Sequence, residues 1–265
     1  MVSAIVPTYN EAPTIASFLS QLVQQLENVR EPFEIWVVDD DSPDRTADAV
    51  SAAFDRDARI RLLRRPAPRS LGAAIRDGIE RGSSDKVIVM DSDFNHDPRA
   101  VPYLLAYLDD FDLVIGSRFA AGGGMPDQHR HVGSFAINLF LRVLLRTQVQ
   151  DNLSGFFAIR RDALLRLPFD EIFWGYGDYF FRLVFFGLRA PLRILEVPVV
   201  YGPRKGGTSK TSLLKTTCQY LYEIVKFRVR YLRPPMPDVM PQPFYAHGTP
   251  VPLEKSAPRR TQSGH

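Results

Sequence analysis

Short hydrophobic runs alternate with amphipathic stretches along the first part of the chain. The hydrophobic runs predict strands at residues 4–6, 33–38, 60–63, 87–90 and 113–115. Between them, apolar positions recur at helical spacing, which predicts helices at residues 15–26, 46–54, 101–108 and from 71 onward. Strands that alternate with helices require right-handed crossovers, and such crossovers build a parallel sheet. The pattern therefore predicts an α/β fold with a mostly parallel sheet flanked by helices.

The alternation loosens after residue 116. Three successive glycines at 122–124 indicate a loop, a further helix is expected at residues 132–146, and a further strand at residues 194–200. The next segment, residues 202–210, combines glycines with basic residues. We expect it to form a loop that can move.

The last part of the chain has a different character. Residues 213–232 show an amphipathic helical pattern in which basic side chains stand among aliphatic and aromatic ones. Residues 234–265 contain eight prolines in 32 positions and little apolar periodicity. We therefore expect one α/β domain over residues 1–210, an amphipathic helix over 211–233 and a disordered tail over 234–265.

Acidic side chains gather where three of the predicted strands end. The sequence PTYNE at residues 7–11 follows the first strand, DDD at residues 39–41 the second, and DSDFN at residues 91–95 the fourth. In a parallel sheet these ends lie at one edge, which is where open α/β sheets bind ligands. Because side chains alternate along a strand, Asp91 and Asp93 can point the same way there. Segments far apart in the sequence are therefore expected to build one crevice.

Two interpretations of the Asp91/Asp93 pair remain open at this point. Adjacent carboxylates repel each other, which favours a bound cation, but Asp97 followed by proline is ordinary chemistry for a solvated turn. No Gly-x-Gly-x-x-Gly follows the first strand and there is no P-loop, so a glycine-rich phosphate cradle is not expected. An oxygen-ligated Mg²⁺ or Mn²⁺ suits carboxylates together with phosphates. For residues 39–41 the competing interpretation is a capping cluster before the next helix.

Composition narrows the class of protein. Hydrophobic residues make up 45% and charged residues 24% of the 265 positions, which is typical of a soluble globular protein. The single cysteine, Cys218, excludes an internal disulfide framework and fits a reducing compartment. The first residues show no signal-peptide pattern, and no window is apolar for long enough to span a bilayer. We therefore expect a cytoplasmic protein.

Six segments together carry a more specific pattern, listed here in chain order: VPTYNE at 6–11, VVDDDSPD at 37–44, MDSD at 90–93, IGSRF at 115–119, DNLSGFF at 151–157, and Arg204 with Lys210. Each is weak alone, because Asp-x-Asp is common by chance. The ordered set covers residues 2–210 and resembles the inverting GT-A glycosyltransferases of glycosyltransferase family 2. Within that family it is most similar to the dolichyl- and polyprenyl-phosphate mannose synthases. The resemblance implies a Rossmann-like GT-A fold.

The resemblance also implies a role for each matching residue. A nucleotide sugar would be bound by Pro7, Tyr9, Glu11, Val38, Asp40, Asp91, Ser92, Asp93, Arg204 and Lys210. The cation, Mg²⁺ or Mn²⁺, would be bound by Asp91, Asp93 and Asn95, the last at a position where the family often has Gln. The acceptor's phosphate would be bound by Arg118, Arg130 and Ser134. Asp93 and Arg118 would also take part in catalysis.

The implied function is the metal-dependent, inverting transfer of a hexose, mannose from GDP-mannose above all, to dolichyl or polyprenyl phosphate. A phosphate acceptor is an anion near neutral pH and needs no general base. A hydroxyl acceptor would need one, and Asp178 is then the candidate catalytic base. The family members tend to carry Glu three positions later, where this chain has Phe181. The hydroxyl acceptor therefore stays open as an alternative.

The partners follow from the same pattern. Residues 135–145 and the basic helix at 213–233 could lie in the interface plane of a membrane, which would place the protein peripherally on its cytoplasmic face. A separate membrane subunit is left open, and nothing in the sequence resembles a nucleic-acid-binding fold. Two further alternatives are a catalytically silent, membrane-associated binding protein and a nucleotidyltransferase on a similar sheet.

Overall fold

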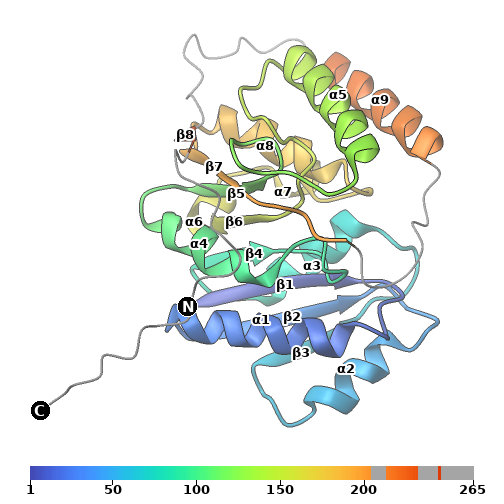
Figure 1. Cartoon of the computed structure of the whole chain (residues 1–265), viewed down its shortest axis with the longest axis vertical. Helices are drawn as coiled ribbons and strands as arrows, with labels where there is room; N and C mark the ends of the chain where they lie inside the picture. The colour runs from blue at the N-terminus through green and yellow to red at the C-terminus, as the bar shows by residue number, and fades with distance from the viewer. Residues whose placement is uncertain (204–212, 232–243, 246–265) are drawn as a thin grey trace, which may run out of the picture.

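The computed structural model describes residues 1–203, 213–231 and 244–245. One sheet crosses the molecule, and helices pack against both of its faces (Figure 1). Its strands lie in the order β3-β2-β1-β4-β6-β5-β7-β8. Their bounds are β1 Val2–Thr8, β2 Phe33–Asp39, β3 Ile60–Arg64, β4 Lys86–Val89, β5 Leu113–Ser117, β6 Phe157–Arg160, β7 Ile194–Pro198 and β8 Phe244–Tyr245.

Helices connect these strands, as the sequence pattern predicts. Their bounds are α1 Ile15–Val29, α2 Thr46–Phe54, α3 Leu71–Arg81, α4 Val101–Ala106, α5 Gln128–Leu145, α6 Arg161–Leu164, α7 Phe169–Ile172, α8 Tyr179–Arg189 and α9 Leu213–Arg230, with short 3-10 turns η1 Pro98–Ala100 and η2 Tyr107–Asp109. Every strand and helix expected from the hydrophobic pattern is present, with ends that differ by a few residues. The predicted mostly parallel α/β fold is confirmed.

Strand β6 and helix α8 were not predicted, and neither were the short elements α6, α7 and β8. Strand β6 runs antiparallel to both β4 and β5, whereas all other neighbouring strands are parallel. It has four residues, three of them apolar, and is too short for its periodicity to distinguish strand from helix. Nine of the eleven residues of α8 are buried, and a short, mostly apolar run of this kind is consistent with a buried strand as well as with a helix.

The sheet separates two hydrophobic cores. Side chains alternate along β1, so Ala4 and Val6 join the core beneath α1 and α4, whereas Ile5 joins the core beneath α3 and α8. Helix α3 approaches the sheet closely because Gly78 lies against Ile5, and a Cβ atom at Gly78 would lie 2.6 Å from the Ile5 Cγ2 atom. Packing of both faces holds the strands in register, and so holds together the edge of the sheet where the loops after the strands begin.

A third hydrophobic cluster joins α5, α8 and α9. The last two of these helices pack through Phe181, Phe185 and Phe227, and α5 contributes Leu141 and Leu145. Figure 1 shows α5 and α9 side by side at one edge of the molecule. Across the described part of the chain, no helix is both long enough and apolar enough to cross a bilayer.

The described residues cover the predicted division of the chain only in part. Helix α9 covers most of the amphipathic segment expected at 211–233. Apart from residues 244–245, the segment expected to be a disordered tail lies outside the described residues, as do residues 204–210 of the expected loop.

Candidate functional site

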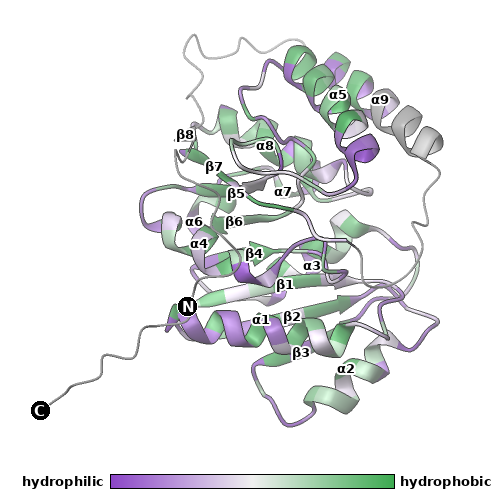
Figure 2. Cartoon of the chain, viewed as in Figure 1, coloured by the Kyte–Doolittle hydropathy of each residue, from purple (hydrophilic) through white to green (hydrophobic). Residues whose placement is uncertain are grey.

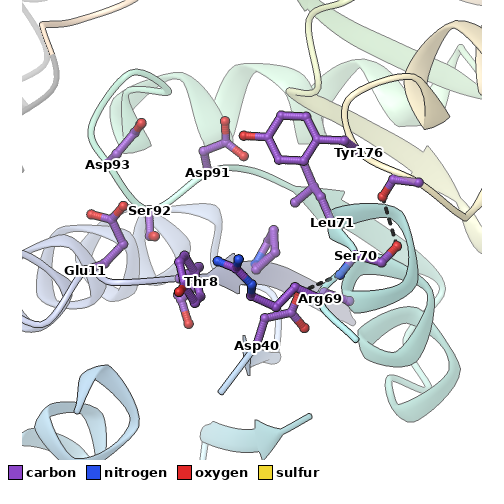
Figure 3. A pocket seen from close by; sticks show the side chains of 14 residues that line it. Thr8, Glu11, Asp40, Arg69, Ser70, Leu71, Asp91, Ser92, Asp93 and Tyr176 are labelled. Carbon is purple, nitrogen blue, oxygen red and sulfur yellow. Dashed lines mark hydrogen bonds between the residues drawn. The ribbon is translucent and has the colours of Figure 1, made fainter. Parts of the chain in front are cut away.

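The loops at the carboxyl ends of β1, β2 and β4 surround a cavity of about 500 Å³. It is lined by a set of residues predicted from the sequence, namely Pro7, Tyr9, Glu11, Asp40, Asp91, Ser92 and Asp93. Thr8, Arg69, Ser70, Leu71, Ala74, Gly175 and Tyr176, which were not predicted, complete the lining. Figure 3 shows Asp91 and Asp93 at one end of the cavity and Asp40 at the other. The expected crevice therefore exists and is assembled from distant segments.

The three aspartates after β2 have different environments. Asp39 is buried and accepts hydrogen bonds from the hydroxyls of Thr8 (3.1 Å) and Ser42 (2.5 Å), so it holds the turn together. Asp40 lines the cavity, is paired with the Arg65 guanidinium and accepts a bond from the Ser70 backbone N–H at 2.9 Å. Asp41 is exposed, with a positive φ of 54°. Asp40 is thus the aspartate that faces the cavity, as the sequence predicts.

The Asp40 end of the cavity contains a guanidinium that lies over an aromatic ring. The Arg69 guanidinium lies over the Tyr9 ring, 4.1 Å from its centroid. This geometry is that of a cation–π contact at an exposed site. Ser70 N-caps α3 by accepting a bond from the Ala73 N–H, and its hydroxyl donates to the Gly175 carbonyl at 2.9 Å. The start of α3 is therefore tied to the opposite wall.

The Asp91–Asp93 loop is held from below by His96. The backbone N–H of Asp91 donates to the His96 Nδ1 atom at 2.9 Å, and the imidazole stacks on Phe156 with centroids 5.0 Å apart. Burial lowers the pKa of His96 to about 4, which keeps the ring neutral, although the Asp93 charge opposes that shift. A neutral imidazole fits a position where it accepts a hydrogen bond on one nitrogen.

The donor set of the cavity fits a hard divalent cation. Among the residues that the structure describes, the lining carries four carboxylates, on Glu11, Asp40, Asp91 and Asp93, and one guanidinium, on Arg69. A phosphate-bearing ligand would be repelled by this surplus of negative charge unless a cation lay between them. Among the described residues, no three His, Cys, Asp or Glu side chains cluster closely enough to hold a metal alone. Two carboxylates completed by ligand phosphates and water are the usual arrangement for Mg²⁺.

Asn95 lies beside this pair without lining the cavity. Its backbone N–H donates to one oxygen of Asp93 at 2.9 Å, and its side-chain amide donates to the other at 3.1 Å. Its predicted role as a third metal ligand stays a prediction, since the amide is turned toward Asp93 in this structure.

Arg118, expected to bind the acceptor's phosphate, is buried in a bidentate ion pair. Its Nε and Nη2 atoms donate to Asp151 at 2.8 and 2.7 Å, and its backbone N–H donates to the same carboxylate at 2.9 Å. Its guanidinium also lies 4.8 Å from the centroid of the Tyr201 ring, whose other neighbour is His96. Arg118 is not among the cavity-lining residues, and its role stays a prediction.

A second buried carboxylate supports this pair. Glu196 is fully buried on β7 and accepts the backbone N–H groups of Gln150 (2.8 Å) and Asp151 (3.0 Å). Burial raises the pKa of Glu196 to about 7, and the nearby Asp151 charge adds to the rise. Glu196 thus carries a proton over much of the range below neutral pH.

Asp178, the candidate base for a hydroxyl acceptor, is buried outside the cavity wall. One carboxylate oxygen is paired with the buried Arg182, and the other accepts the Tyr176 backbone N–H at 2.7 Å. Both oxygens are therefore already engaged in holding the turn at residues 174–176. This geometry does not support the use of Asp178 as a base.

The other predicted residues that the structure describes do not line the cavity. Val38 is fully buried against α3, so only its backbone could approach a ligand. Arg130 and Ser134 lie in the first turns of α5, where Arg130 is exposed. Arg204 and Lys210 lie outside the described residues.

Some of the lining residues that were not predicted could have been found, because ligands bind at the carboxyl ends of parallel strands. Arg69, Ser70 and Leu71 follow β3, whose carboxyl end lies at the same edge as the other three. Tyr176 belongs to the turn before α8 and does not follow a parallel strand. No local pattern would have placed it there.

Comparisons with known proteins agree with this geometry. The profile of a family described as "Glycosyl transferase family 2" matches residues 3–167. An "Undecaprenyl-phosphate mannosyltransferase" of Micrococcus luteus is 36% identical over 221 residues, which cover 80% of this chain and 87% of that protein. A "Dolichol-phosphate mannosyltransferase" of Pyrococcus furiosus is 32% identical over 233 residues, and the match covers 85% of this chain but 63% of that longer protein.

Solved structures show the same fold. Glucosyl-3-phosphoglycerate synthase from Mycobacterium tuberculosis, in complex with Mn²⁺, uridine diphosphate and glucosyl-3-phosphoglycerate, superposes with a TM-score of 0.62. The match covers 86% of this chain and 79% of that one at 22% identity. A likeness at this identity concerns the fold alone.

The buried Glu196 predicts a pH-dependent stability. Its pKa is near 4.5 in an unfolded chain and about 7 in the folded protein, so the folded state binds the proton more tightly. Its contribution is greatest at low pH and is lost as pH rises toward 7. Between about pH 5 and about pH 8, the unfolding free energy of Glu196→Gln should rise by roughly 2 to 3 kcal/mol relative to the wild type. Urea denaturation at both pH values, with Glu80→Gln as a control at an exposed site, measures this; a pH-independent difference would contradict the assignment.

Proposed function

Because the chain belongs to glycosyl transferase family 2, we propose that it transfers a hexose, with inversion, from a nucleotide sugar to a polyprenyl phosphate. The observation that carries the proposal is the convergence of Tyr9, Asp40 and the Asp91/Asp93 pair on one cavity. We propose mannose from GDP-mannose as the donor, since the relatives named above are mannosyltransferases.

The two ends of the cavity suit the two ends of such a donor. Tyr9, Asp40 and Arg69 offer an aromatic face, a carboxylate and a cation for a nucleoside. Asp91 and Asp93 at the other end offer oxygen ligands for the cation that accompanies a diphosphate. Arg204 and Lys210, in the basic segment after β7, are proposed to contact the diphosphate as well.

The chemistry needs a stable leaving group more than it needs a base. A phosphate oxygen of the acceptor attacks the anomeric carbon, and the bonding electrons of the broken sugar–phosphate bond leave with the nucleoside diphosphate. A divalent cation held by Asp91 and Asp93 would stabilise the negative charge that develops there. Arg118, fixed by Asp151, is proposed to hold the acceptor's phosphate, with Arg130 and Ser134 at the start of α5.

The alternatives are less well supported by the geometry. A hydroxyl acceptor needs a base, and both oxygens of Asp178 are engaged by Arg182 and Tyr176. A silent binding protein would have no use for two adjacent carboxylates on a cavity wall, whose mutual repulsion costs stability unless a cation binds. A nucleotidyltransferase would release pyrophosphate instead of a nucleoside diphosphate.

A lipid acceptor requires contact with a membrane, and the α5/α9 surface suits it. Helix α5 exposes Val132, Phe135, Leu139, Phe140 and Val143, and α9 exposes Tyr222, Val225 and Val229. Figure 2 shows that α5 is hydrophobic beyond its first turn, although it lies at the edge of the molecule. Basic side chains such as Lys226 and Arg230 are exposed on the same helix pair. Apolar contact and attraction to anionic lipid together support peripheral binding.

Product analysis tests the proposed reaction. The protein, with labelled GDP-mannose, undecaprenyl phosphate and Mn²⁺, should form a lipid-soluble mannosyl product. Undecaprenol, which lacks the phosphate, is the matched acceptor and should give none. A product from undecaprenol would favour the hydroxyl-acceptor alternative. If neither GDP-mannose nor UDP-glucose nor any other nucleotide sugar gives a lipid product, the proposal is wrong.

The Asp91 carboxylate should be essential for the transfer. We expect Asp91→Asn to lower kcat/KM by about 100-fold or more, because the loss of a metal ligand removes several kcal/mol of charge stabilisation. Asp97→Asn is the matched control on the same loop. Asp97 N-caps η1 and is paired with Arg99, and Asn caps helices equally well. Steady-state kinetics across a Mn²⁺ titration measures both; equal effects of the two substitutions would argue against the metal site.

The α5/α9 surface should govern membrane binding. Phe135 and Val143 are 48% and 73% exposed, so their joint replacement by Ser should leave the fold intact. Because each apolar side chain contributes about 1.5–3 kcal/mol when buried, binding to vesicles should weaken about ten-fold or more. Cosedimentation with phosphatidylcholine vesicles containing phosphatidylglycerol measures this. Leu165→Ser, at a 68% exposed site on a different surface, should bind like the wild type; an equal loss there would contradict the assignment.

A further inference from the structure

The cavity has a wall that none of the roles described so far explains. In a nucleotide sugar the hexose is attached to the distal phosphate, so it lies beyond the diphosphate from the nucleoside. The residues assigned above account for the nucleoside end and the cation end. Tyr176 also lines the cavity, and it comes from the carboxyl-terminal half of the chain. Its side chain lies next to the cation end, and no role in binding the nucleoside or the metal has been assigned to it.

Figure 3 shows where the Tyr176 side chain points. Its hydroxyl is directed toward the carboxylate of Asp91, across the cavity from Asp40. The residue is 51% exposed, so its ring presents a large surface to the cavity. A tyrosine offers a hydroxyl that donates and accepts hydrogen bonds, together with a flat apolar face. Both features match a sugar, which has hydroxyl groups on its rim and C–H groups on its faces.

The turn that carries Tyr176 is fixed from two sides. Its backbone N–H donates to Asp178, which is itself paired with the buried Arg182. Gly175, with a φ of 76°, accepts bonds at its carbonyl from the Ser70 hydroxyl (2.9 Å) and the Gly72 N–H (3.1 Å).

The turn also packs tightly against the start of α3. A Cβ atom at Gly72 would lie 2.6 Å from the Trp174 carbonyl oxygen, closer than real atoms approach. The Tyr176 backbone is therefore held in place before any ligand binds, and little conformational entropy remains to be lost at this turn on binding. Such preorganisation is what a residue that discriminates between ligands requires.

We propose that Tyr176 contacts the donor's hexose and is a specificity-determining residue for it. The inference rests on the proposed function, because it assigns the sugar end of the same cavity. The Tyr176 hydroxyl forms a hydrogen bond with a sugar hydroxyl beside Asp91, and the ring packs on the sugar face. The buried Asp178–Arg182 pair then has a purpose that needs no proton transfer, namely to present this side chain.

Calorimetry with paired ligands tests the assignment without turnover. The protein is titrated, in the presence of Mn²⁺, with GDP and GDP-mannose and with UDP and UDP-glucose. For the pair that the wild type binds, Tyr176→Phe should weaken the nucleotide sugar by about ten-fold, as expected for the loss of a hydrogen bond, and leave the nucleoside diphosphate unchanged. In competition experiments, the ratio of the affinities for GDP-mannose and GDP-glucose should also move closer to one in this variant. Tyr107→Phe, at a partly exposed tyrosine away from the cavity, should change neither affinity.

The outcomes separate this inference from the proposed function. Equal weakening of both members of a pair would show that Tyr176 acts through Asp91 and the cation, and would overturn the assignment. Unchanged affinity for both would overturn it as well, while leaving the transferase proposal intact. If the wild type binds no nucleoside diphosphate and no nucleotide sugar, the proposed function fails and the assignment fails with it.

Discussion

The hydrogen-bonded register of β1 with its two neighbours is the constraint on which the cavity depends. Thr8 lies opposite Asp39, and the Met90 N–H donates to the Ile5 carbonyl, so the acidic loops after β1, β2 and β4 begin at one edge of the sheet. A slip of one residue would turn every side chain of a strand to the opposite face. The two hydrophobic cores prevent this, because each face of β1 has its own set of apolar partners. The site is thus positioned by side chains that never touch a ligand.

Arginine–carboxylate ion pairs with little exposure to solvent hold the loops in place relative to the sheet. Asp40 with Arg65, Asp151 with Arg118 and Asp178 with Arg182 each fix one loop near the cavity. Breaking such a pair by removal of one partner costs about 3–5 kcal/mol, since a buried charge is left uncompensated. The carboxylates near the site therefore have different positions. Asp151 and Asp178 hold loops outside the cavity lining, Asp40 is paired with Arg65 and also lines the cavity, and Asp91 and Asp93 line its other end.

The two parts of the chain contribute different things. The segments at the ends of β1, β2, β3 and β4 supply the described lining of the cavity apart from Gly175 and Tyr176. The part after residue 120 supplies the Tyr176 turn and the apolar surface of α5 and α9, and β6 runs antiparallel where the two parts meet. This arrangement suits the proposed transfer from a water-soluble donor to a lipid acceptor, because the cavity is polar and the α5/α9 surface is apolar.

The sequence by itself determined the α/β class, the mostly parallel sheet and the cavity-facing residues after β1, β2 and β4. It could do so because hydrophobic periodicity and the position of strand ends can be read from neighbouring residues. In a parallel sheet the carboxyl ends of the strands lie at one edge, so the residues that follow them lie close together. Only the tertiary structure decided that Asp178 forms a buried ion pair with Arg182 and that Arg118 forms one with Asp151, since burial depends on segments that are distant in the sequence. The same holds for Tyr176, which reaches the cavity because Gly175 bonds to Ser70 across 105 positions of chain. Long-range contacts of this kind leave no trace in the spacing of residues.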